Sequence, residues 1–378
     1  MVKDLLVETL VAGGEGLGFL DGKAVFVRGV LPGERVRVRL RESRRDYERA
    51  ELREVLGASP RRVAPACPLA GTCGGCDWMH IAYEEQLRLK VGIVREALRR
   101  TGGIEIDAVA AGNLRVEPSP PFASRNRAQV HRDQAGRLGY MAAGSERVVP
   151  AGRCPIVVPP IEAVLRGELP APEGLDRFTV WSDGADFAAE GRDDDRDLTV
   201  NVHGRQILFS VGCFFQSNLA VLEELVPWAV EGAGSGRAAD LYSGVGLFAS
   251  FLSAQGANVT CVESSTLSLG YARRNVPGTE HEFHPMSVES WIVSGAARGP
   301  FDTVVADPPR PGLSPEVRAW LCAHPPRRLV YVSCNPVTLA RDLGAFIAGG
   351  FALEDLRLFD FYPQTSHIEA VARLRGPS

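Results

Sequence analysis

Hydrophobic and polar residues alternate along residues 1–57 in several short runs that glycine-containing turns separate. In the run ERVRVRL, which starts at Glu34, valines and arginines take turns, so one face is apolar and the other is charged. A period of two is typical of a half-buried strand. Several short strands at this spacing predict a small β-barrel over residues 1–57.

The middle of the chain shows two further patterns. Residues 83–100 carry apolar positions at helical spacing and predict one long helix. Residues from about 111 to 212 contain strand-like runs broken by Pro- and Gly-rich segments, which predicts a middle β region. The segments 158–173 and 183–196 are expected to be exposed loops.

From about residue 214 the chain alternates between apolar runs of strand length and segments with helical spacing. The runs are RAADLYS, NVTCVES, FDTVVADPP and RRLVYVSCNP. Such alternation is the signature of a doubly wound parallel sheet. We therefore predict a mixed β and α/β protein in three parts: a barrel (1–57), a β-rich middle domain (58–213) and a Rossmann-like domain (214–378). The helix near 82–100 is expected to pack on the last part.

Composition places this chain of 378 residues among ordinary globular proteins, with 45% hydrophobic and 23% charged residues. The sequence has no apolar run of about 18 residues that would suit a membrane span. Its first residues lack a signal-peptide pattern. We expect a cytoplasmic protein that has no membrane contact and no obligate protein partner.

The net charge of −4 conceals an uneven distribution. Between Arg28 and Arg62, eleven arginines stand against six acidic residues. A basic part on an acidic body fits a nucleic-acid contact on one face. A solvated, arginine-rich strand surface fits the charge equally well, and charge alone leaves both interpretations open.

A glycine-rich segment, Asp240-Leu-Tyr-Ser-Gly-Val-Gly, joins a predicted strand to a helix through Gly244 and Gly246. Glycines let the backbone turn sharply and approach a ligand closely. Glu263 ends the next strand, where a carboxylate accepts hydrogen bonds from ribose hydroxyls. The loop lacks the third glycine of dinucleotide sites, and no Gly-Lys-Ser/Thr is present. Both absences favour S-adenosylmethionine over NAD or ATP, with ordinary turn glycines as the alternative.

Three chemically active side chains follow or end apolar runs. Asp307 begins Asp-Pro-Pro-Arg, and because proline has no N–H the sheet stops there. Cys334 lies between a strand and a helix, where the N-terminus of the helix favours a thiolate. An inert core cysteine is the alternative, which polar Ser333 and Asn335 disfavour. Glu369, near the C-terminus, suits either a general base or an ordinary strand-edge carboxylate.

Four of the eight cysteines lie apart from this C-terminal set. They are Cys67, Cys73, Cys76 and Cys154. In a cytoplasmic chain such thiols are more often metal ligands, catalytic groups or core residues than disulfides. Four thiolates suit zinc or an Fe–S cluster, and their uneven spacing differs from paired CxxC knuckles. Four unliganded cysteines are the remaining alternative.

Taken in order, the motifs resemble those of the RNA 5-methyluridine methyltransferases over nearly the whole chain. The matching segments are Phe-Phe-Gln216-Ser-Asn, Asp-Leu-Tyr242-Ser-Gly-Val-Gly, Val-Glu263, Asp307-Pro-Pro-Arg, Ser-Cys334-Asn-Pro and His-Ile-Glu369. The resemblance implies that Cys334 attacks carbon 6 of a uracil and that Glu369 accepts the proton from carbon 5. It implies contacts to S-adenosylmethionine from Gln216, Tyr242, Glu263 and Asp307.

The resemblance extends to the N-terminal half of the chain. The first 57 residues resemble the TRAM domain, which implies a small OB-like RNA-binding barrel. The four cysteines resemble the [4Fe-4S] ligands of the ribosomal RNA branch. This implies RNA, in particular 23S ribosomal RNA, as the partner. Leu247 and Ser287 depart from the family pattern, so no cofactor contact is carried over to them. The run Arg125-Asn126-Arg127 is expected to be either an RNA contact or a surface turn.

Three other functions stay open at this point. Cytosine-C5 methylation uses the same thiolate addition, although the contexts of Cys334 and Glu369 favour uridine. Transfer RNA is another substrate for the same chemistry. An RNA-binding Fe–S protein without transferase activity is the third, and the presence of both side chains speaks against it.

Overall fold

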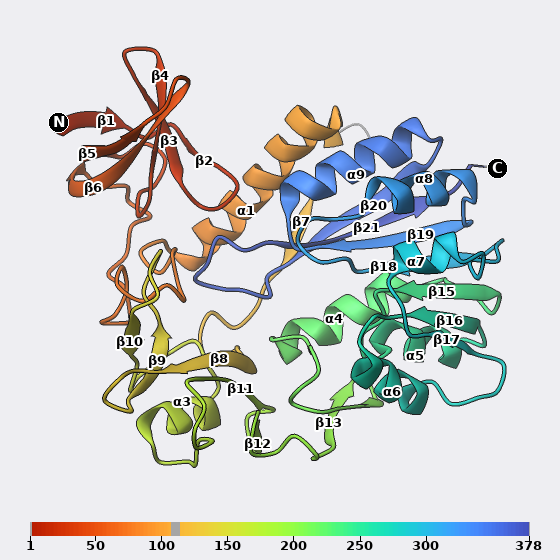
Figure 1. The fold of residues 1–378 in the computed structure, drawn as a ribbon. Coiled ribbons are helices and arrows are strands. Elements are labelled where there is room, and N and C mark those ends of the chain that lie inside the picture. Colours follow the sequence, from red (N-terminus) through yellow and green to blue (C-terminus); the bar gives the residue numbers. More distant parts are fainter. Residues whose placement is uncertain (1, 107–113, 378) are drawn as a thin grey trace.

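The computed structural model describes residues 2–106 and 114–377. Residues 111–113, where the middle β region is expected to begin, lie outside the described residues. Among the described residues the strands form four sheets: one N-terminal, one in the middle, a two-stranded hairpin and a large C-terminal sheet (Figure 1).

The N-terminal sheet has six strands in the order β1-β5-β6-β4-β3-β2. They are β1 (Val2–Leu6), β2 (Thr9–Leu10), β3 (Gly16–Leu20), β4 (Lys23–Val27), β5 (Arg35–Ser43) and β6 (Tyr47–Gly57). Val36 and Val38 of β5 are fully buried, as the alternation predicts. The edge strands β1 and β2 are consecutive in the chain, so the sheet curls strongly. No ladder among the described residues joins β1 to β2, so the structure shows a curled sheet in place of the predicted closed barrel.

The middle sheet has the strand order β10-β9-β8-β11-β12. Its strands are β8 (Arg127–Arg132), β9 (Leu138–Met141), β10 (Val148–Pro150), β11 (Arg177–Ser182) and β12 (Phe187–Ala189). The loop predicted over 158–173 is wrong, since α3 (Pro159–Arg166) packs there with Ile161 and Val164 fully buried. Proline is favoured in the first turn of a helix, so the prolines that suggested a loop begin this helix. The segment 183–196 likewise contains β12.

The C-terminal sheet has eight strands in the order β17-β16-β15-β18-β19-β21-β20-β7. They are β7 (Arg115–Glu117), β15 (Arg237–Leu241), β16 (Asn258–Val262), β17 (Glu282–His284), β18 (Thr303–Ala306), β19 (Arg328–Ser333), β20 (Ala352–Phe359) and β21 (Glu369–Arg375). The strands from β17 to β19 are parallel, as predicted. Beyond β19 the order is no longer parallel, because β21 is inserted antiparallel between β19 and β20.

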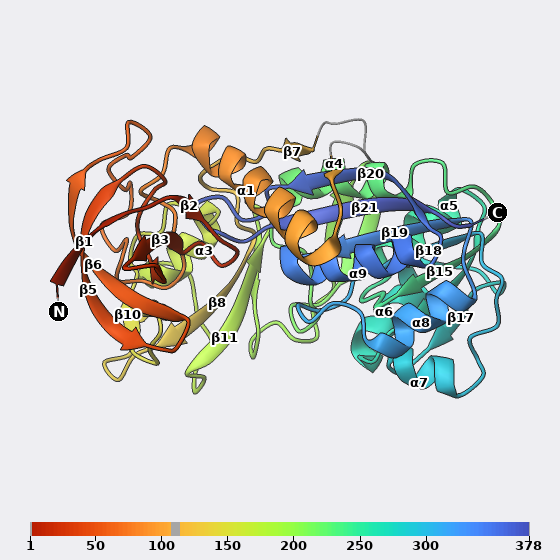
Figure 2. The ribbon, with the colours of Figure 1, turned by 90° about the horizontal axis from the view of Figure 1, so that it is seen from above.

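Helices cover both faces of this sheet (Figures 1 and 2). One face packs against α1 (Tyr83–Ala97), α7 (Val288–Val293), α8 (Pro315–Ala323) and α9 (Pro336–Ala348). The other packs against α4 (Leu219–Val230), α5 (Leu247–Ala254), α6 (Thr266–Asn275) and the hairpin of β13 (Leu198–Val202) and β14 (Arg205–Phe209). The short π-helix Leu98–Gly102 extends α1. The domain limits at 57/58 and 213/214 stay a proposal. Among the described helices, we find no candidate for a membrane span.

Candidate active site

The chemically active side chains lie at one edge of the C-terminal sheet. Strands β15, β18 and β19 are parallel neighbours, so their carboxyl ends meet there. Asp307 follows β18 directly, and Cys334 follows β19. The antiparallel strand β21 begins at Glu369, and its register pairs Ser333 with Ala370. Cys334 and Glu369 are the next residues along these two strands, so the topology brings the predicted nucleophile and the predicted base together.

The thiol of Cys334 is half-buried among charged groups. Burial, and then the carboxyls of Glu369 and Asp307, raise the pKa of Cys334 to about 11, whereas the Arg310 guanidinium lowers it. This net direction is opposite to the depression that we expected from the N-terminus of α9. The free thiol is therefore mostly protonated at neutral pH, and it becomes a nucleophile only after it loses that proton.

Glu369 and Asp307 form a pair of neighbouring carboxyl groups. The side chain of Glu369 is buried, and its pKa is held well above the usual range, first by burial and then by Asp307. Burial raises the pKa of Asp307 to about 7. Two carboxyls this close do not ionise independently, because the second negative charge is repelled by the first. A pair that holds a proton near neutral pH, beside a thiol, is suited to proton transfer.

Two further side chains complete this part of the site, and the sequence did not single them out. Arg310 is the last residue of Asp-Pro-Pro-Arg, and its Nη2 lies 3.4 Å from Nδ1 of His367. Tyr362 packs edge-on against His367 with ring centroids 5.6 Å apart. Burial, and then Glu369, raise the pKa of the Tyr362 phenol. Arg310 stood inside a quoted motif and could have been found, whereas no sequence signal marked Tyr362.

The glycine loop begins at the carboxyl end of β15. Tyr242 has a φ of 63°, a left-handed conformation that is costly for a non-glycine residue and is often found at functional sites. Gly244 has a φ of 53° and faces open space where a Cβ would point. At Gly246 a Cβ would lie 3.0 Å from Ala272 of α6. Gly244 therefore keeps the loop open, and Gly246 allows α5 and α6 to pack closely.

Several carboxyl groups gather beside this loop. Oε2 of Glu263 accepts a hydrogen bond from the Gly244 N–H at 3.0 Å, and its Oε1 accepts one from the Ser265 N–H at 2.7 Å. Burial, and then Asp307 and Glu263, raise the pKa of Asp240 to about 8. Oδ1 of Asp240 is buried without a hydrogen-bond partner among the described residues. This concentration of carboxyls suits a ligand that carries positive charge.

Gln216 lies on a different element, the segment between β14 and α4. The side chain is half-buried. Its neighbour Phe215 stacks on Phe209 of β14 with ring centroids 4.3 Å apart, which anchors the segment. Ser217, the next residue, lies beside Tyr362. Gln216 thus lies between Phe215, which is anchored on β14, and Ser217, which lies beside Tyr362.

The run Arg125-Asn126-Arg127 leads into β8 and is not a surface turn. Asn126 is buried, and its side-chain amide bonds to the backbone of β11 and of the first residue of α4. Arg125 forms an isolated β-bridge with Val157, and Arg127 is the first residue of β8. Arg125 lies over the Tyr362 ring, 5.9 Å from its centroid, and Arg127 lies 5.5 Å from the centroid of Phe214. The ring of Phe214 is 62% exposed.

The two departures from the family pattern have structural roles. Leu247 begins α5 and is buried in the core on that face of the sheet. Ser287 is the N-cap of α7, where its Oγ accepts a hydrogen bond from the Ser290 N–H at 3.2 Å. Both side chains therefore contribute to packing or capping at their positions.

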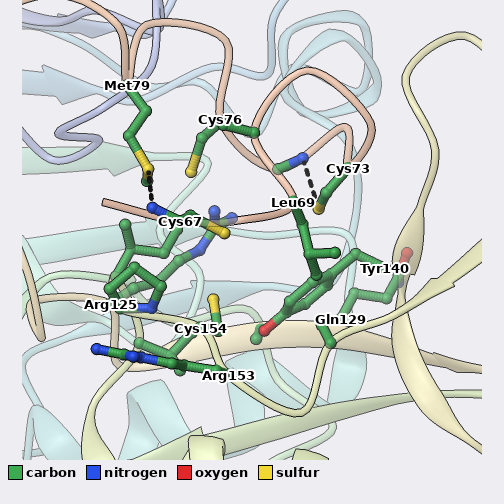
Figure 3. A pocket seen from close by; sticks show the side chains of 17 residues that line it. Cys67, Leu69, Cys73, Cys76, Met79, Arg125, Gln129, Tyr140, Arg153 and Cys154 are labelled. Atoms are coloured by element: carbon green, nitrogen blue, oxygen red, sulfur yellow. Dashed lines mark hydrogen bonds between the residues drawn. The ribbon is translucent and has the colours of Figure 1, made fainter. Parts of the chain in front are cut away.

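The four N-terminal cysteines line one cavity of about 140 Å³ (Figure 3). Cys67, Cys73 and Cys76 come from the loop before α1, and Cys154 comes from the segment after β10. Figure 3 shows their sulfurs around a common space, with Arg125 on its wall. Residues that are far apart in the sequence are thus gathered at one place.

Charge repulsion is built into this cavity. Burial, and then Cys154, raise the pKa of Cys76 to about 12, and burial also raises the pKa of Cys73 and of Cys154. These shifts mean that ionising the thiols is costly. A metal ion or cluster would offset that cost, because thiolate is the form that binds metal. Within residues 2–106 and 114–377, no three His, Cys, Asp or Glu side chains form a group that could hold a metal ion as they stand.

Two family models match this chain. The model of the tRNA (Uracil-5-)-methyltransferases matches residues 297–375, which include Asp307, Cys334 and Glu369. The TRAM domain model matches residues 2–52, most of the curled N-terminal sheet.

Similar proteins cover nearly the full length of the chain. An uncharacterized RNA methyltransferase from Treponema denticola is 33% identical, over 94% of this chain and 94% of its own length. The 23S rRNA (uracil(1939)-C(5))-methyltransferase RlmD of Pseudomonas fluorescens is 32% identical, over 97% of this chain and 93% of its own. The crystal structure of Pyrococcus abyssi tRNA (uracil-54, C5)-methyltransferase with S-adenosyl-L-homocysteine has a TM-score of 0.74 at 24% identity, covering 99% of this chain and 100% of its own. This last likeness establishes the shared fold.

Proposed function

We propose a substrate and a mechanism for this chain, which belongs to the RNA (uracil-C5-)-methyltransferases and forms 5-methyluridine in RNA. The proposed substrate is 23S ribosomal RNA, the RNA named for the Pseudomonas relative, and the uracil equivalent to its position 1939 is the first to examine. The arginine-rich N-terminal sheet supports an RNA partner, because cationic side chains bind the phosphate backbone. The observation that carries the proposal is the adjacency of Cys334 and Glu369 across β19 and β21.

The proposed mechanism begins with the thiolate of Cys334. It adds to carbon 6 of the uracil, forming a C–S bond and making carbon 5 electron-rich. Arg310 offsets the negative charge of this sheet edge, as its effect on the pKa of Cys334 indicates. S-adenosylmethionine, when bound, would supply the electrophilic methyl group of its sulfonium to carbon 5 and leave as the neutral thioether S-adenosylhomocysteine.

Glu369 completes the reaction. Its carboxylate removes the proton from carbon 5 of the methylated adduct, the double bond between carbons 5 and 6 forms again, and Cys334 leaves as a thiolate. The buried carboxyl has a raised pKa, which makes it a better proton acceptor than an exposed glutamate once it is ionised. Asp307 stays close to both groups and contributes to that shift.

The methyl donor fits the carboxyl-rich loop end of the sheet. S-adenosylmethionine carries positive charge on its sulfonium and amino groups, which the neighbouring carboxyls Asp240 and Asp307 would stabilise. Glu263 is fixed by backbone N–H groups and keeps acceptor capacity for the ribose hydroxyls. We assign Gln216 and Tyr242 as further contacts from the two segments that flank this space.

A flipped-out base fits the opposite side of the same site. The exposed ring of Phe214 and the guanidinium of Arg127 lie together, and both present flat faces on which a base stacks. Arg127 also lies near Tyr362, which places this pair close to Cys334. Entry of the base along this path would expose its carbon 6 to the thiol.

For the four cysteines we propose a [4Fe-4S] cluster held by Cys67, Cys73, Cys76 and Cys154. Four thiols around a cavity are the donor set that such a cluster uses, and binding it would stabilise the loop before α1. Protein purified anaerobically should be brown and contain about four irons and four sulfides per chain. Stoichiometric zinc without iron would contradict the cluster, but it would still support a metal site formed by the four thiols.

The decisive test of the substrate is nucleoside mass spectrometry of ribosomal and transfer RNA from a deletion strain. Loss of 5-methyluridine from 23S rRNA, restored by the wild-type gene, is the expected result. Loss of 5-methyluridine from tRNA alone would move the proposal to tRNA, and loss of 5-methylcytidine would move it to cytosine. Unchanged 5-methyluridine in both RNAs would favour an RNA-binding protein without transferase activity.

A further inference from the structure

The segment 360–368, which joins β20 to β21, leads directly into Glu369. It also carries Tyr362 and His367 of the active site. Figure 1 shows this blue segment reaching away from the sheet toward the orange chain before α1, and Figure 2 shows the same from above. The position of Glu369 therefore depends on what holds this segment at its far end.

The centre of the segment adopts a costly backbone conformation. Gln364 has a φ of 65°, which is disfavoured for a residue with a side chain. Its backbone carbonyl accepts a hydrogen bond from the Trp78 N–H at 3.0 Å. Its backbone N–H donates to Oε1 of buried Gln86 at 2.9 Å, and its Oε1 accepts from Nε2 of Gln86 at 3.0 Å. Such a conformation persists only where surrounding contacts enforce it, as these do.

A second tether links the segment to the cysteine loop. Oδ1 of Asp77 accepts a hydrogen bond from the Ser366 N–H at 2.8 Å. Asp77 is the residue after Cys76, whose thiol faces the cavity. The backbone three residues before Glu369 is therefore bonded to the loop that holds the proposed metal site.

The N-terminal sheet closes this junction through a glycine. At Gly14 an added Cβ would lie 2.5 Å from Cβ of Ser366 and 2.8 Å from Oδ2 of Asp77. The Gly14 carbonyl accepts a hydrogen bond from Trp78 Nε1 at 3.4 Å. Neighbouring Gly13 also has a positive φ, but a Cβ there would meet nothing within 4 Å. Of these two glycines, Gly14 is the one that contact with the segment requires.

The start of the segment is anchored separately, on α1. Lys90 and Asp360 form an ion pair of 2.5 Å, with both side chains almost completely buried. Nζ of Lys90 also donates to the Tyr362 carbonyl at 3.0 Å. Because this anchor does not involve the N-terminal sheet or the cysteine loop, loss of the junction would free only the part of the segment next to Glu369.

We propose that the junction of Gly14, Asp77 and Ser366 positions Glu369 for proton removal from carbon 5, so that this step requires the N-terminal sheet and the cysteine loop to be docked on the segment 360–368. Asp77 and Gly14 are then positioning residues. They contact Ser366, and they act through the backbone between Ser366 and Glu369. The inference rests on the proposed mechanism, because it assigns the junction to the step that Glu369 performs.

The test compares two pairs of full-length, metal-loaded variants. Asp77→Ala removes the acceptor, and Asp77→Asn retains an oxygen at the same place. Gly14→Ala introduces the clash, and Gly13→Ala adds the same methyl group to the neighbouring left-handed glycine without a clash. We expect Asp77→Ala and Gly14→Ala to lower kcat by about 10- to 100-fold, the cost of a small misplacement of a reacting group, with little change in KM. Asp77→Asn and Gly13→Ala should stay within a few-fold of wild type.

The readouts separate positioning from general damage. Denaturing gels should show more covalent RNA–protein adduct for Asp77→Ala and Gly14→Ala than for wild type, because proton removal follows addition. Hydrogen exchange of the amides in 364–369 should be faster in the same two variants, with iron content unchanged. If Asp77→Ala also loses iron, its lower kcat can have a second cause, and the result for Gly14→Ala then tests the proposal.

Two results would overturn the proposal. Wild-type kcat and unchanged exchange in both Asp77→Ala and Gly14→Ala would remove the junction from catalysis, even if Glu369→Gln traps an adduct as the mechanism requires. Equal losses of kcat in Gly13→Ala and Gly14→Ala would show that backbone strain, and not contact with Ser366, causes the effect. Failure of Glu369→Gln to trap an adduct would instead count against the mechanism, and the exchange measurement would still report on the junction.

Discussion

Cys334 and the cysteines of the cavity present the same side chain in two surroundings. Cys334 lies at a sheet edge beside two carboxyls and Arg310. Cys76 faces three other thiols in a largely apolar cavity that Arg125 and Tyr140 also line. Burial raises the pKa of both thiols, so burial does not distinguish them. Their neighbours do, because a carboxyl can exchange protons with a substrate, whereas several neighbouring thiols ionise together only when a cation offsets their charge.

The comparison predicts its largest difference in turnover. Cys334→Ala should lower methyl transfer by more than about 10⁴-fold, because no neighbouring side chain replaces a covalent nucleophile. Binding of S-adenosylmethionine, measured by calorimetry, should remain. Retained turnover would refute the assignment of Cys334. A variant that loses both turnover and cofactor binding would point to damaged folding.

A smaller loss is expected at the base. Glu369→Gln should lower kcat by about 10²- to 10⁴-fold, the usual contribution of general base catalysis. Unlike Cys334→Ala, it should accumulate a covalent RNA adduct, because the C–S bond forms and is not eliminated. The adduct is measured on a denaturing gel with labelled RNA. Absence of the adduct, with addition intact by another assay, would remove Glu369 from this role.

The cavity thiols should affect stability more directly than chemistry. If the proposed cluster is bound, Cys76→Ala should release its iron and lower the free energy of unfolding by more than about 2 kcal/mol, since metal binding contributes to folding. Cys261→Ala is a matched control, because this thiol is fully buried in β16 and outside the cavity, and its loss should cost about 1 kcal/mol. Chemical denaturation and iron analysis measure both. Equal losses with metal retained would contradict a ligand role for Cys76.

The sequence was informative where chain order decides geometry. Parallel strands in succession bring their carboxyl ends to one edge, so the positions of Asp307, Glu263 and Cys334 followed from the apolar runs. Half-buried β5 could likewise be recognised by its alternating valines and arginines. These features depend on local pattern and on a topology that few arrangements satisfy.

Features that depend on tertiary pairing could not be predicted. Glu369 lies beside Cys334 only because β21 is inserted between β19 and β20, and nothing in its own sequence selects those partners. The pKa of Cys334 is raised, whereas the sequence led us to expect a lowered one. The reason is similar, since burial and the two carboxyls outweigh the helix terminus. Arg125 lies over Tyr362 and lines the cysteine cavity, and an isolated β-bridge to Val157 holds its backbone there. In each case the deciding neighbour is distant in sequence.

The smallest predicted effect tests the carboxyl contribution to the Cys334 thiol directly. Because its pKa is raised to about 11, alkylation of Cys334 by iodoacetamide without RNA should speed up steadily from pH 7 to pH 10 and level off only above about pH 11. Asp307 is one cause of that shift, so Asp307→Asn should lower the pKa and speed alkylation at pH 9 by about two- to tenfold. Asp302→Asn changes a carboxyl at the opposite end of β18, just before Thr303, and should leave the rate unchanged. Peptide mass spectrometry measures labelling at Cys334, and a slower rate in Asp307→Asn would show that Asp307 holds the thiol by a contact other than its charge.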